Sequence, residues 1–561
     1  MNQHSTSLTR RTFVKTTGAL GALAAASGVL VASEGIVKEA PIAHADSPET
    51  IAWGQCNVNC AGNCIFQWHV KDGKVQYMET DNTGSVDLQG RACLRGRTMR
   101  RWLNHPDRLQ YPMKRVGKRG EGKFERISWD EATSIIADKL RYTIDTYGNE
   151  AIYIIYATGM YSCLGKPGNR LLSLLGGYLN QGYDYSTHML QAIMPYMYGS
   201  SANLDENGNH ITLGVPATAF SPYDSINASS MTEAELHSDL IFMFGNSPSE
   251  TRMGGANITW DFARAREAVL ERGGKVIIVD PRMNESISGH PDEWQPIRPG
   301  TDAALASAIA HEWIVNDQID KSFLDNYTVG FDDSTMPASA RGQHKSYRDY
   351  IMGTGYDMVE KTPEWAAPIT QISAEMLADA EAPFIAQGWG PQRHTNGEDT
   401  TRAITMLPIL LGKIGLPGTN TGQREAEPSI YLVGGISGTV PNPVTTTIPV
   451  YQYLNAIDHG KDMTATNAGI MGADKLNTDI KFIWNYAGNC LTNQHGDINY
   501  THDILVDDTK CEFILVWDTV MTDSAKYADL ILPDAMRSES LNMQTQGYGE
   551  WYTALCVGGP A

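Results

Sequence analysis

The sequence predicts an α/β protein built on parallel sheets, with a small cysteine-rich domain before them. Short apolar runs of β-branched and aromatic residues recur from residue 150 onward and end on Gly, Asp or Asn. Such runs are typical of strands buried on both faces. Segments with helical periodicity lie between several runs, such as residues 260–271 before Gly273 and Gly274, and strand–helix–strand units of this kind form parallel sheets. The expected strands are residues 151–156, 240–245, 275–280, 383–388, 480–486 and 512–518.

Ligand-binding residue types follow the ends of these expected strands. Asp280 ends one of them, and Gly245 and Asn246 end another, before a loop with Glu250 and Thr251. Two further turns, residues 298–302 and 387–393, also combine Gly with polar or charged residues. Each alone reads equally well as a simple turn, but ligands of parallel sheets bind at the carboxyl ends of the strands. Together they indicate a dinucleotide-like ligand, and because GxGxxG and GxxxxGK[ST] are absent, NAD and ATP are not the default choice.

The cysteine-rich segment contains Cys56, Cys60 and Cys64 at a regular spacing, followed by Cys93. Four thiols in a loop-rich segment suit an iron–sulfur cluster or zinc. Zinc ribbons favour two closely spaced Cys-x-x-Cys pairs, whereas this three-plus-one arrangement favours a [4Fe–4S] cluster. Two structural disulfides are the alternative, but thiols one helical turn apart are poor partners for each other.

Composition excludes some classes of function. The net charge of −20 argues against a nucleic-acid partner, because phosphate binding needs a basic surface. The remaining cysteines, Cys163, Cys490, Cys511 and Cys556, are scattered and form no disulfide framework.

The N-terminus has the pattern of a twin-arginine signal peptide. Arg10 and Arg11 precede an uncharged Ala/Gly/Leu run over residues 16–32, and residues 43–45 form a small-x-small cleavage site. A cytosolic amphipathic helix is the alternative. No later run reaches the ~18 apolar residues expected of a membrane helix. We therefore expect an exported, soluble mature chain on the outer face of the cytoplasmic membrane or in the periplasm, attached to the membrane only through a partner.

Several longer stretches resemble the molybdopterin oxidoreductases of the dimethyl sulfoxide reductase family, and among them the catalytic subunits of the membrane-associated anaerobic reductases. The resemblance runs from about Trp53 to Met543 in one order. Its carrying stretches include NTGSVDLQGRACLRGR, NHPDRLQYPMKR, KFERISWDEA, FGNSPSETRM, IRPGTDAAL, KTPEWA, GWGPQRHTNGE, WNYAGNCLTNQH and DSAKYADLILPD.

The resemblance implies the family's domain plan. A signal peptide over residues 1–45 precedes a [4Fe–4S] domain over residues 46–115. Two interleaved Rossmann-like domains follow: a discontinuous α/β molybdopterin domain and a guanine-dinucleotide domain. We expect the first over residues 116–205 and 395–561 and the second over residues 206–394. The family's C-terminal β-rich domain is missing from this plan.

The resemblance also implies the cofactors, a molybdenum ion held by two molybdopterin guanine dinucleotides and one [4Fe–4S] cluster. In the matching place of the family's S- and N-oxide reductases, a serine after a tyrosine binds the molybdenum, and here that residue is Ser186. It would bind as the alkoxide, because the cation lowers its pKa. A helix-capping serine is the plain alternative, and Asp184 is the second choice as a metal ligand.

The family's other site residues are assigned by the same resemblance. Cys56, Cys60, Cys64 and Cys93 are the expected cluster ligands, and Arg95 matches a basic residue between cluster and pterin, with a solvated surface arginine as the alternative. The expected cofactor-binding residues are Glu250, Thr251, Val279, Asp280, Gly300, Thr301, Asp302, Trp389, Gly390, Arg393, Asn489, Trp517 and Asp518.

The implied activity is oxygen-atom transfer from an S-oxide or N-oxide in anaerobic respiration. Two electrons would arrive through the cluster, and two protons would release the oxygen as water; Tyr185 and Trp389 could shape the substrate pocket. The implied partners are a ferredoxin-like iron–sulfur subunit and a membrane anchor that oxidises quinol. A hydratase, transhydroxylase or catechol dehydroxylase of the same family and a cluster-only electron carrier are the alternatives.

Two departures from the family affect these expectations. The loop over residues 159–165, near the expected substrate funnel, is shorter than in similar sequences. The resemblance therefore does not identify the substrate. The sequence also ends at Ala561, and we expect the resemblance to stop after Met543. A chain truncated in this way would hold the cofactor poorly by itself.

Overall fold

The computed structural model describes residues 48–56, 58, 60, 64–80, 90–155, 167–183, 185–198, 229–252, 255, 257–372, 382–425, 440–486, 488–494, 496–540, 542–544 and 556–558. Apart from the turn at Lys71–Gly73, the elements below belong to one compact unit, Thr50–Val70 with Lys74–Ala561. The expected signal peptide, Cys163, Asp184 and the loop over residues 159–165 lie outside the described residues. Predictions made for them stay predictions.

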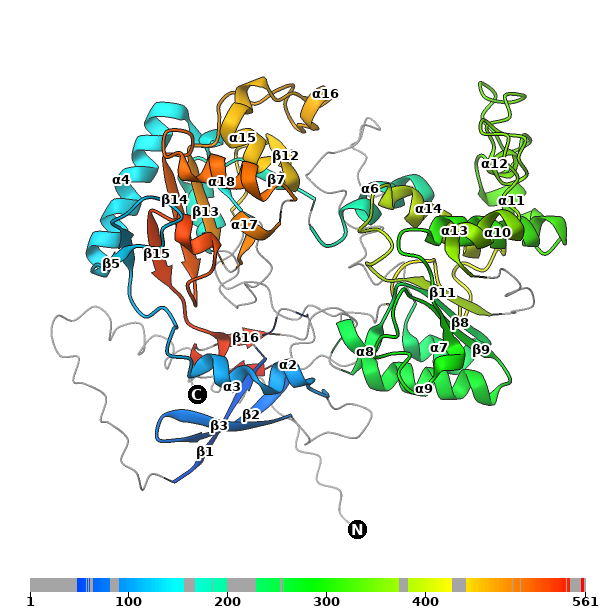
Figure 1. Cartoon of the computed structure of the whole chain (residues 1–561), viewed down its shortest axis with the longest axis horizontal. Helices are drawn as coiled ribbons and strands as arrows, with labels where there is room; N and C mark the ends of the chain where they lie inside the picture. Colours follow the sequence, from blue (N-terminus) through cyan, green and yellow to red (C-terminus); the bar gives the residue numbers. More distant parts are fainter. Residues whose placement is uncertain are drawn as a thin grey trace, which may run out of the picture. The chain divides into compact units, whose positions relative to one another are not determined.

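The cysteine-rich segment folds on a three-stranded antiparallel sheet, in the order β1-β2-β3 (Figure 1). Phe66 and Trp68, two residues apart on β2, are both fully buried, as side chains on one face of a strand should be. Asp72 and Gly73 form the turn after β2, with φ angles of 53° and 69°. The elements are β1 (Thr50–Gln55), β2 (Ile65–Lys71), β3 (Lys74–Thr80), α2 (Leu94–Arg97) and α3 (Met99–Leu103).

A four-stranded sheet in the order β10-β9-β8-β11 is entirely parallel. Alternate residues of β8 enter two separate hydrophobic clusters, Phe242 and Phe244 one of them and Ile241 and Met243 the other. Helices α10, α13 and α14 cover the first face, and α7 and α9 cover the second (Figure 1). The strands are β8 (Leu240–Phe244), β9 (Lys275–Val279), β10 (Trp294–Gln295) and β11 (Pro383–Gln387). The helices are α7 (Met231–His237), α9 (Ile258–Glu271), α10 (Asp302–Val315), α13 (Pro363–Thr370) and α14 (Gly397–Leu410).

A six-stranded sheet in the order β5-β4-β15-β14-β13-β6 takes strands from both sides of the four-stranded sheet in the sequence. Its four strands β6, β13, β14 and β15 are parallel, and β4 and β5 add an antiparallel edge. The strands are β4 (Met113–Arg115), β5 (Phe124–Arg126), β6 (Ile152–Ile154), β13 (Phe482–Tyr486), β14 (Phe513–Asp518) and β15 (Leu530–Pro533). The packed helices are α4 (Trp129–Tyr147), α5 (Pro167–Leu174), α15 (Tyr453–His459) and α18 (Ile498–Val506).

The remaining elements are short, apart from α6 (His188–Tyr198). Two small sheets pair β7 (Asn180–Gly182) with β12 (Thr447–Pro449), and β16 (Asn542–Gln544) with β17 (Cys556–Gly558). The other helices are α8 (Pro248–Thr251), α11 (Lys321–Tyr327), α12 (Tyr347–Ile351), α16 (Ala465–Ala468) and α17 (Cys490–Asn493). Single 3-10 turns occupy Asn149–Ala151, Pro291–Glu293, Val450–Gln452, Gly460–Asp462, Ser524–Tyr527 and Arg537–Glu539.

All six expected strands are present, with ends that differ by one or two residues. The expected helix over residues 260–271 is α9, and it stops before Gly273, whose φ angle is 79°. Within the described part of the chain, none of the helices has both the length and the apolar character needed to span a membrane.

Candidate active site

The first three cysteines lie in the loop that joins β1 to β2. The Cys56 N–H donates to the Cys64 carbonyl at 2.9 Å, which closes the base of this loop. The side chains are shielded from solvent, since Cys56, Cys60 and Cys64 are only 3%, 9% and 6% exposed. The Val58 N–H donates to the Cys56 sulfur at 3.4 Å. Cys60, Cys93, Cys490 and Cys511 are free thiols in the described part of the chain, so the disulfide alternative gains no support from them.

Cys93 approaches this loop from the start of helix α2. A Cβ atom added to Gly96 would lie 3.2 Å from the Cys56 sulfur, so the helix backbone passes very close to that thiol. Burial raises the pKa of the Cys93 thiol, but hydrogen bonds from the Gly96 N–H and Arg95, with the charges of Arg252 and Arg95, bring that pKa below its usual value. The surroundings therefore favour the thiolate, which is the form that binds metals.

Arg95 connects the cysteine loop to the four-stranded sheet. Its charge interacts with both Cys93 and Cys60, and its guanidinium donates to the Glu250 carbonyl at 2.6 Å. Glu250 belongs to α8, which follows β8. Within the described residues, the His, Cys, Asp and Glu side chains form no group of three arranged to hold a metal ion. Residues 57, 59 and 61–63 of the cysteine loop lie outside that set.

A cavity of about 290 Å³ lies at the carboxyl ends of β8, β9 and β11. The strand register places Phe244 beside Val279 and Gln387, so the residues that follow these strands meet at one edge of the sheet. Eight of the expected cofactor-binding residues line the cavity: Glu250, Thr251, Asp280, Gly300, Asp302, Trp389, Gly390 and Arg393. Val279 and Thr301 are the sequence neighbours of lining residues.

Carboxylates hold the loops of this cavity in place. The two carboxylate oxygens of Asp280 accept the Arg282 N–H and the Asn284 amide, each at 2.9 Å. Glu250 pairs with the Arg282 guanidinium through Oε1 at 2.5 Å, whereas its Oε2 is buried with no hydrogen-bond partner in the described part of the chain. A buried carboxylate oxygen without a donor is a candidate acceptor for a ligand.

The other expected cofactor residues lie on the six-stranded sheet instead. Asn489 follows β13, and Trp517 and Asp518 end β14. The Asn489 side-chain oxygen accepts the Ser524 N–H at 2.9 Å, and the Trp517 ring stacks on Trp484 at 6.1 Å. Burial raises the pKa of the Asp518 carboxyl. The three residues thus form a separate group at the carboxyl ends of a second parallel sheet.

Ser186 lies in a turn between Tyr183 and α6. Its carbonyl accepts hydrogen bonds from the Gln392 amide at 2.5 Å and from the Arg393 guanidinium at 2.9 Å. The turn is strained, because Tyr183 has a φ angle of 63°, a left-handed conformation that a bulky side chain rarely adopts. Such strain is concentrated at functional sites.

Aromatic rings surround this turn. The Tyr183 ring lies 4.1 Å from His188, and the Tyr451 ring lies 5.2 Å from His188 and 5.0 Å from Tyr185. The Tyr185 hydroxyl donates to the Val450 carbonyl at 3.2 Å. The turn is therefore fixed by ring packing on one side and by the loop after β11 on the other.

Comparison with protein families divides the chain into the cysteine-rich segment and the part that contains the two parallel sheets. The family "Molybdopterin oxidoreductase" matches residues 108–551, and "Molybdopterin oxidoreductase Fe4S4 domain" matches residues 49–105. The chain belongs to the molybdopterin oxidoreductase family. The match continues past Met543, so our expectation that the resemblance stops there is wrong.

Curated relatives include the dimethyl sulfoxide reductases DmsA of Escherichia coli and Haemophilus influenzae. They are 46% and 45% identical to this chain over 95% and 96% of it. The dimethyl sulfoxide/trimethylamine N-oxide reductase of Rhodobacter capsulatus is 27% identical over 79% of the chain and 53% of its own length. The chain spans 64% and 66% of the two DmsA proteins. Acetylene hydratase from Pelobacter acetylenicus has the same fold, with a TM-score of 0.60, 21% identity and 91% of this chain and 67% of that chain covered.

Membership of the molybdopterin oxidoreductases fits a molybdenum–bis(molybdopterin guanine dinucleotide) cofactor and one [4Fe–4S] cluster. The residues present suit both groups. Buried thiols, an N–H···S bond and a nearby cation are the usual surroundings of a cluster. A cavity at the carboxyl ends of parallel strands, with a buried acceptor, suits the nucleotide end of a pterin cofactor.

Several residues of the nucleotide cavity were missed by sequence reasoning. Ser247 and Arg282 lie within two residues of Asn246 and Asp280, which the sequence did indicate, so those two positions were the available signal. Arg424 had none, because it reaches the cavity from a segment that follows α14. Its guanidinium carbon lies 5.6 Å from the Trp389 ring, and that of Arg393 lies 5.7 Å from the same ring. Trp389 is thus a shared cation–π partner of both arginines.

Asp302 should make the stability of this molybdopterin oxidoreductase depend on pH. Burial raises the pKa of its carboxyl from 3.8 to about 6, an effect reduced by its own N–H and by His394. Since the folded state binds the proton more tightly, this group's contribution to stability falls as pH rises from about 4 to 6 and stays reduced above 6. We expect Asp302→Asn to raise the free energy of unfolding at pH 7 by up to about 3 kcal/mol.

Denaturant unfolding at pH 4 and pH 7 would measure this difference between the variant and the parent chain. Asp145→Asn, at an exposed position on α4, is the matched control and should change neither value. An Asp302→Asn variant with the parent's pH dependence would show that the carboxyl is not proton-linked to folding.

Gly388 and Gly390 allow a matched test of the loop after β11. A Cβ atom at Gly388 would lie 2.1 Å from the Gly245 carbonyl oxygen, whereas one at Gly390 would lie 3.4 Å from it. We expect Gly388→Ala to lower the free energy of unfolding by about 3 kcal/mol, and Gly390→Ala to change it by less than about 1 kcal/mol. Equal effects in denaturant unfolding would contradict the close approach.

Proposed function

We propose that the protein carrying this chain is an exported molybdenum enzyme that reduces S-oxides or N-oxides by oxygen-atom transfer. The observation that carries the proposal is the 46% identity to DmsA of Escherichia coli over 95% of this chain. The 27% identity to a dimethyl sulfoxide/trimethylamine N-oxide reductase supports the same chemical class. The respiratory role and the preferred oxide belong to the proposal.

Ser186 is the proposed protein ligand of the molybdenum. The Gln392 and Arg393 side chains hold its carbonyl, so the main chain of the turn cannot easily rotate the hydroxyl away. When bound, the molybdenum cofactor supplies the two-electron redox chemistry. The surrounding residues bind and orient the substrate, and the rings of Tyr183, Tyr185 and Tyr451 restrict water and large substrates near Ser186.

The proposed electron route passes from the cluster cysteines through Arg95 to the cofactor loops. Arg95 interacts with the charges of Cys60 and Cys93 and donates to the Glu250 carbonyl. A cation here favours the more negative, reduced state of a neighbouring cluster. Glu250, Thr251, Asp280, Gly300, Asp302 and Arg393 are the proposed contacts of one guanine dinucleotide, and Asn489, Trp517 and Asp518 those of the second pterin.

The proposed partner subunits and cellular location rest on the same similarity to DmsA. The partners are a ferredoxin-like iron–sulfur subunit, which delivers electrons, and a membrane anchor that oxidises quinol. Export by the twin-arginine route, predicted from Arg10 and Arg11, places the protein on the periplasmic side of the membrane. This route carries folded proteins, which suits a cluster inserted before export.

The deciding measurement is the metal and pterin content of the protein after anaerobic purification, with oxide-reduction assays. We expect about four irons, one molybdenum and two guanine dinucleotides per chain, and turnover of dimethyl sulfoxide or trimethylamine N-oxide that requires a reduced dye. Iron without molybdenum would support a cluster-only electron carrier instead. A reaction that needs no reductant would support a hydratase or transhydroxylase.

A further inference from the structure

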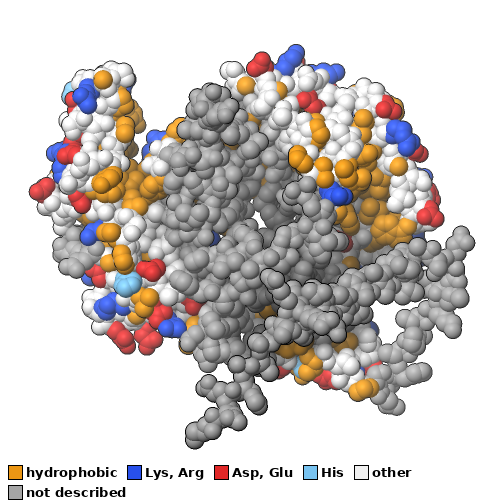
Figure 2. Space-filling view, turned by 180° about the vertical axis from the view of Figure 1, so that it is seen from behind, with side chains coloured by type: hydrophobic (Ala, Val, Ile, Leu, Met, Phe, Trp, Pro, Cys, Tyr) orange, Lys and Arg blue, Asp and Glu red, His pale blue; other side chains and the backbone are white. Residues whose placement is uncertain are grey.

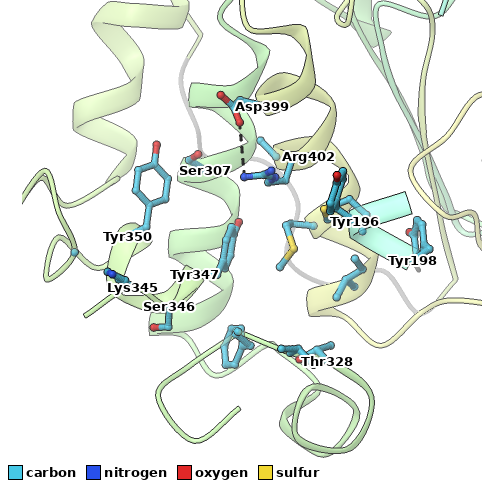
Figure 3. A pocket seen from close by; sticks show the side chains of 18 of the residues that line it. Tyr196, Tyr198, Ser307, Thr328, Lys345, Ser346, Tyr347, Tyr350, Asp399 and Arg402 are labelled. Atoms are coloured by element: carbon cyan, nitrogen blue, oxygen red, sulfur yellow. Dashed lines mark ion pairs between the residues drawn. The ribbon is translucent and has the colours of Figure 1, made fainter. Parts of the chain in front are cut away.

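A second, larger cavity of about 870 Å³ lies among the helices on one face of the four-stranded sheet (Figure 3). Residues from α6, α10, α11, α12 and α14 line it, together with the segment between α11 and α12. It is a different cavity from the nucleotide site, although α10 contributes to both: Asp302 lines the nucleotide cavity, and Ala303 and Ser307 line this one. Its volume is typical of sites for small organic molecules.

Tyrosine is the most frequent residue in the walls of this cavity. Six tyrosines line it, Tyr196, Tyr198, Tyr327, Tyr347, Tyr350 and Tyr356. Three of them are also unusually exposed for their size, with Tyr196 84%, Tyr327 78% and Tyr356 87% exposed. In the view from behind, hydrophobic side chains are exposed in the upper-left part of the picture, where α12 lies (Figure 2). Flat aromatic walls favour a ligand with rings of its own, because rings stack in offset or edge-to-face pairs.

One buried hydroxyl in the cavity lacks a partner. The hydroxyls of Ser307, Thr328 and Tyr198 donate to main-chain carbonyls, and the Ser346 hydroxyl donates to the Asp349 carboxylate. The Tyr347 hydroxyl is buried and has no hydrogen-bond partner among the described residues. Burial raises the pKa of Tyr347, so this hydroxyl keeps its proton and is available as a donor.

The cavity is also less acidic than the chain as a whole. Among the described residues that line it, Lys345 and Arg402 face it with one carboxylate, Asp399, although the chain has a net charge of −20. Arg402 is only loosely paired with Asp399, at 3.7 Å, and both side chains are more than half exposed. Figure 3 shows the Tyr347 hydroxyl pointing toward the part of the cavity where Arg402 and Ser307 lie. The Tyr347 hydroxyl, a hydrogen-bond donor, and the Arg402 cation therefore face the same part of the cavity.

We propose that this cavity binds a small aromatic carboxylate, with its rings against the tyrosines and its carboxylate at Tyr347 and Arg402. The Tyr347 hydroxyl donates to one carboxylate oxygen, and the Arg402 guanidinium exchanges Asp399 for the ligand. Both interactions are charge-assisted, and such hydrogen bonds are stronger than neutral ones. The site does not require the metal or the pterin, so ligand binding here can be tested independently of the reductase activity.

Calorimetric titration of the purified chain with 2-naphthoate and its neutral analogue 2-naphthamide tests this site. We expect saturable binding of one naphthoate per chain, about tenfold tighter than the amide. Tyr347→Phe should weaken naphthoate about tenfold, the effect of losing one charge-assisted hydrogen bond. Arg402→Gln should also weaken naphthoate about tenfold, but should leave the amide unchanged, so that the preference for the anion disappears.

A matched variant controls for indirect effects. Arg348→Gln removes an exposed cation of α12 outside the cavity. It should not change the affinity for naphthoate.

Thermal unfolding separates binding from folding. Tyr347→Phe should leave the unliganded chain as stable as the parent or more so, because it deletes a buried donor without a partner. Absence of saturable naphthoate binding, or equal binding by Tyr347→Phe and the parent, would overturn the proposal.

Discussion

Protein carrying Cys56→Ser is expected to retain less than one iron per chain, where the parent holds about four. Cys56 is the buried thiol at the base of the β1–β2 loop, and its sulfur accepts the Val58 N–H. A serine hydroxyl is a harder and less acidic ligand than a thiol, so it binds iron poorly. Because Gly96 brings the α2 backbone close to this sulfur, a bulkier side chain at position 56 would press against the helix.

Iron and acid-labile sulfide per chain, with the visible absorption of the cluster, would measure this loss. Cys490→Ser is the control, because Cys490 is also buried but starts α17, which packs beside the six-stranded sheet. It should keep its iron. A Cys56→Ser protein with a full complement of iron would remove Cys56 from the ligand set and with it the three-plus-one assignment.

The strands of both parallel sheets could be predicted because the signal is local. Residues 240–244 form an unbroken apolar run, and each of them is buried in β8 since helices cover both faces of the sheet. β13 is also buried at every residue although it includes Asn485, and the first four residues of β14 are apolar and buried. By contrast, β7 and β12 pair residues 180–182 with residues 447–449. Such a short pairing between distant segments leaves no periodic pattern in either of them.

The nucleotide cavity could be predicted only as far as it follows strand ends. Asp280 and Gly390 directly follow or adjoin buried strands, so the parallel register brings them to one edge. Arg424 and His394 reach the same cavity from loops whose course depends on tertiary packing. The pKa of Asp302 likewise depends on burial by other segments, which no local pattern reports. The aromatic cavity was missed for a similar reason, since its tyrosines come from three helices, α6, α11 and α12, and from the segment that follows α12.

Replacing Ser186 by alanine is expected to lower oxide reduction at least about 100-fold while leaving the iron content unchanged. A change in the groups that merely support a metal ligand costs about 10–100-fold, so loss of the ligand itself should cost at least as much. The fold around the turn should persist, because Gln392 and Arg393 hold the Ser186 carbonyl and not its side chain. Molybdenum content and turnover with a reduced dye, measured on the same preparation, separate a lost ligand from a lost cofactor.

Two comparisons make the Ser186 result specific. Ser186→Cys keeps a metal-binding side chain, so it should retain more molybdenum coordination than Ser186→Ala, visible in X-ray absorption as sulfur in place of oxygen. Ser134→Ala, at an exposed position on α4, should behave as the parent. Full turnover by Ser186→Ala would exclude the serine and make Asp184 the next candidate.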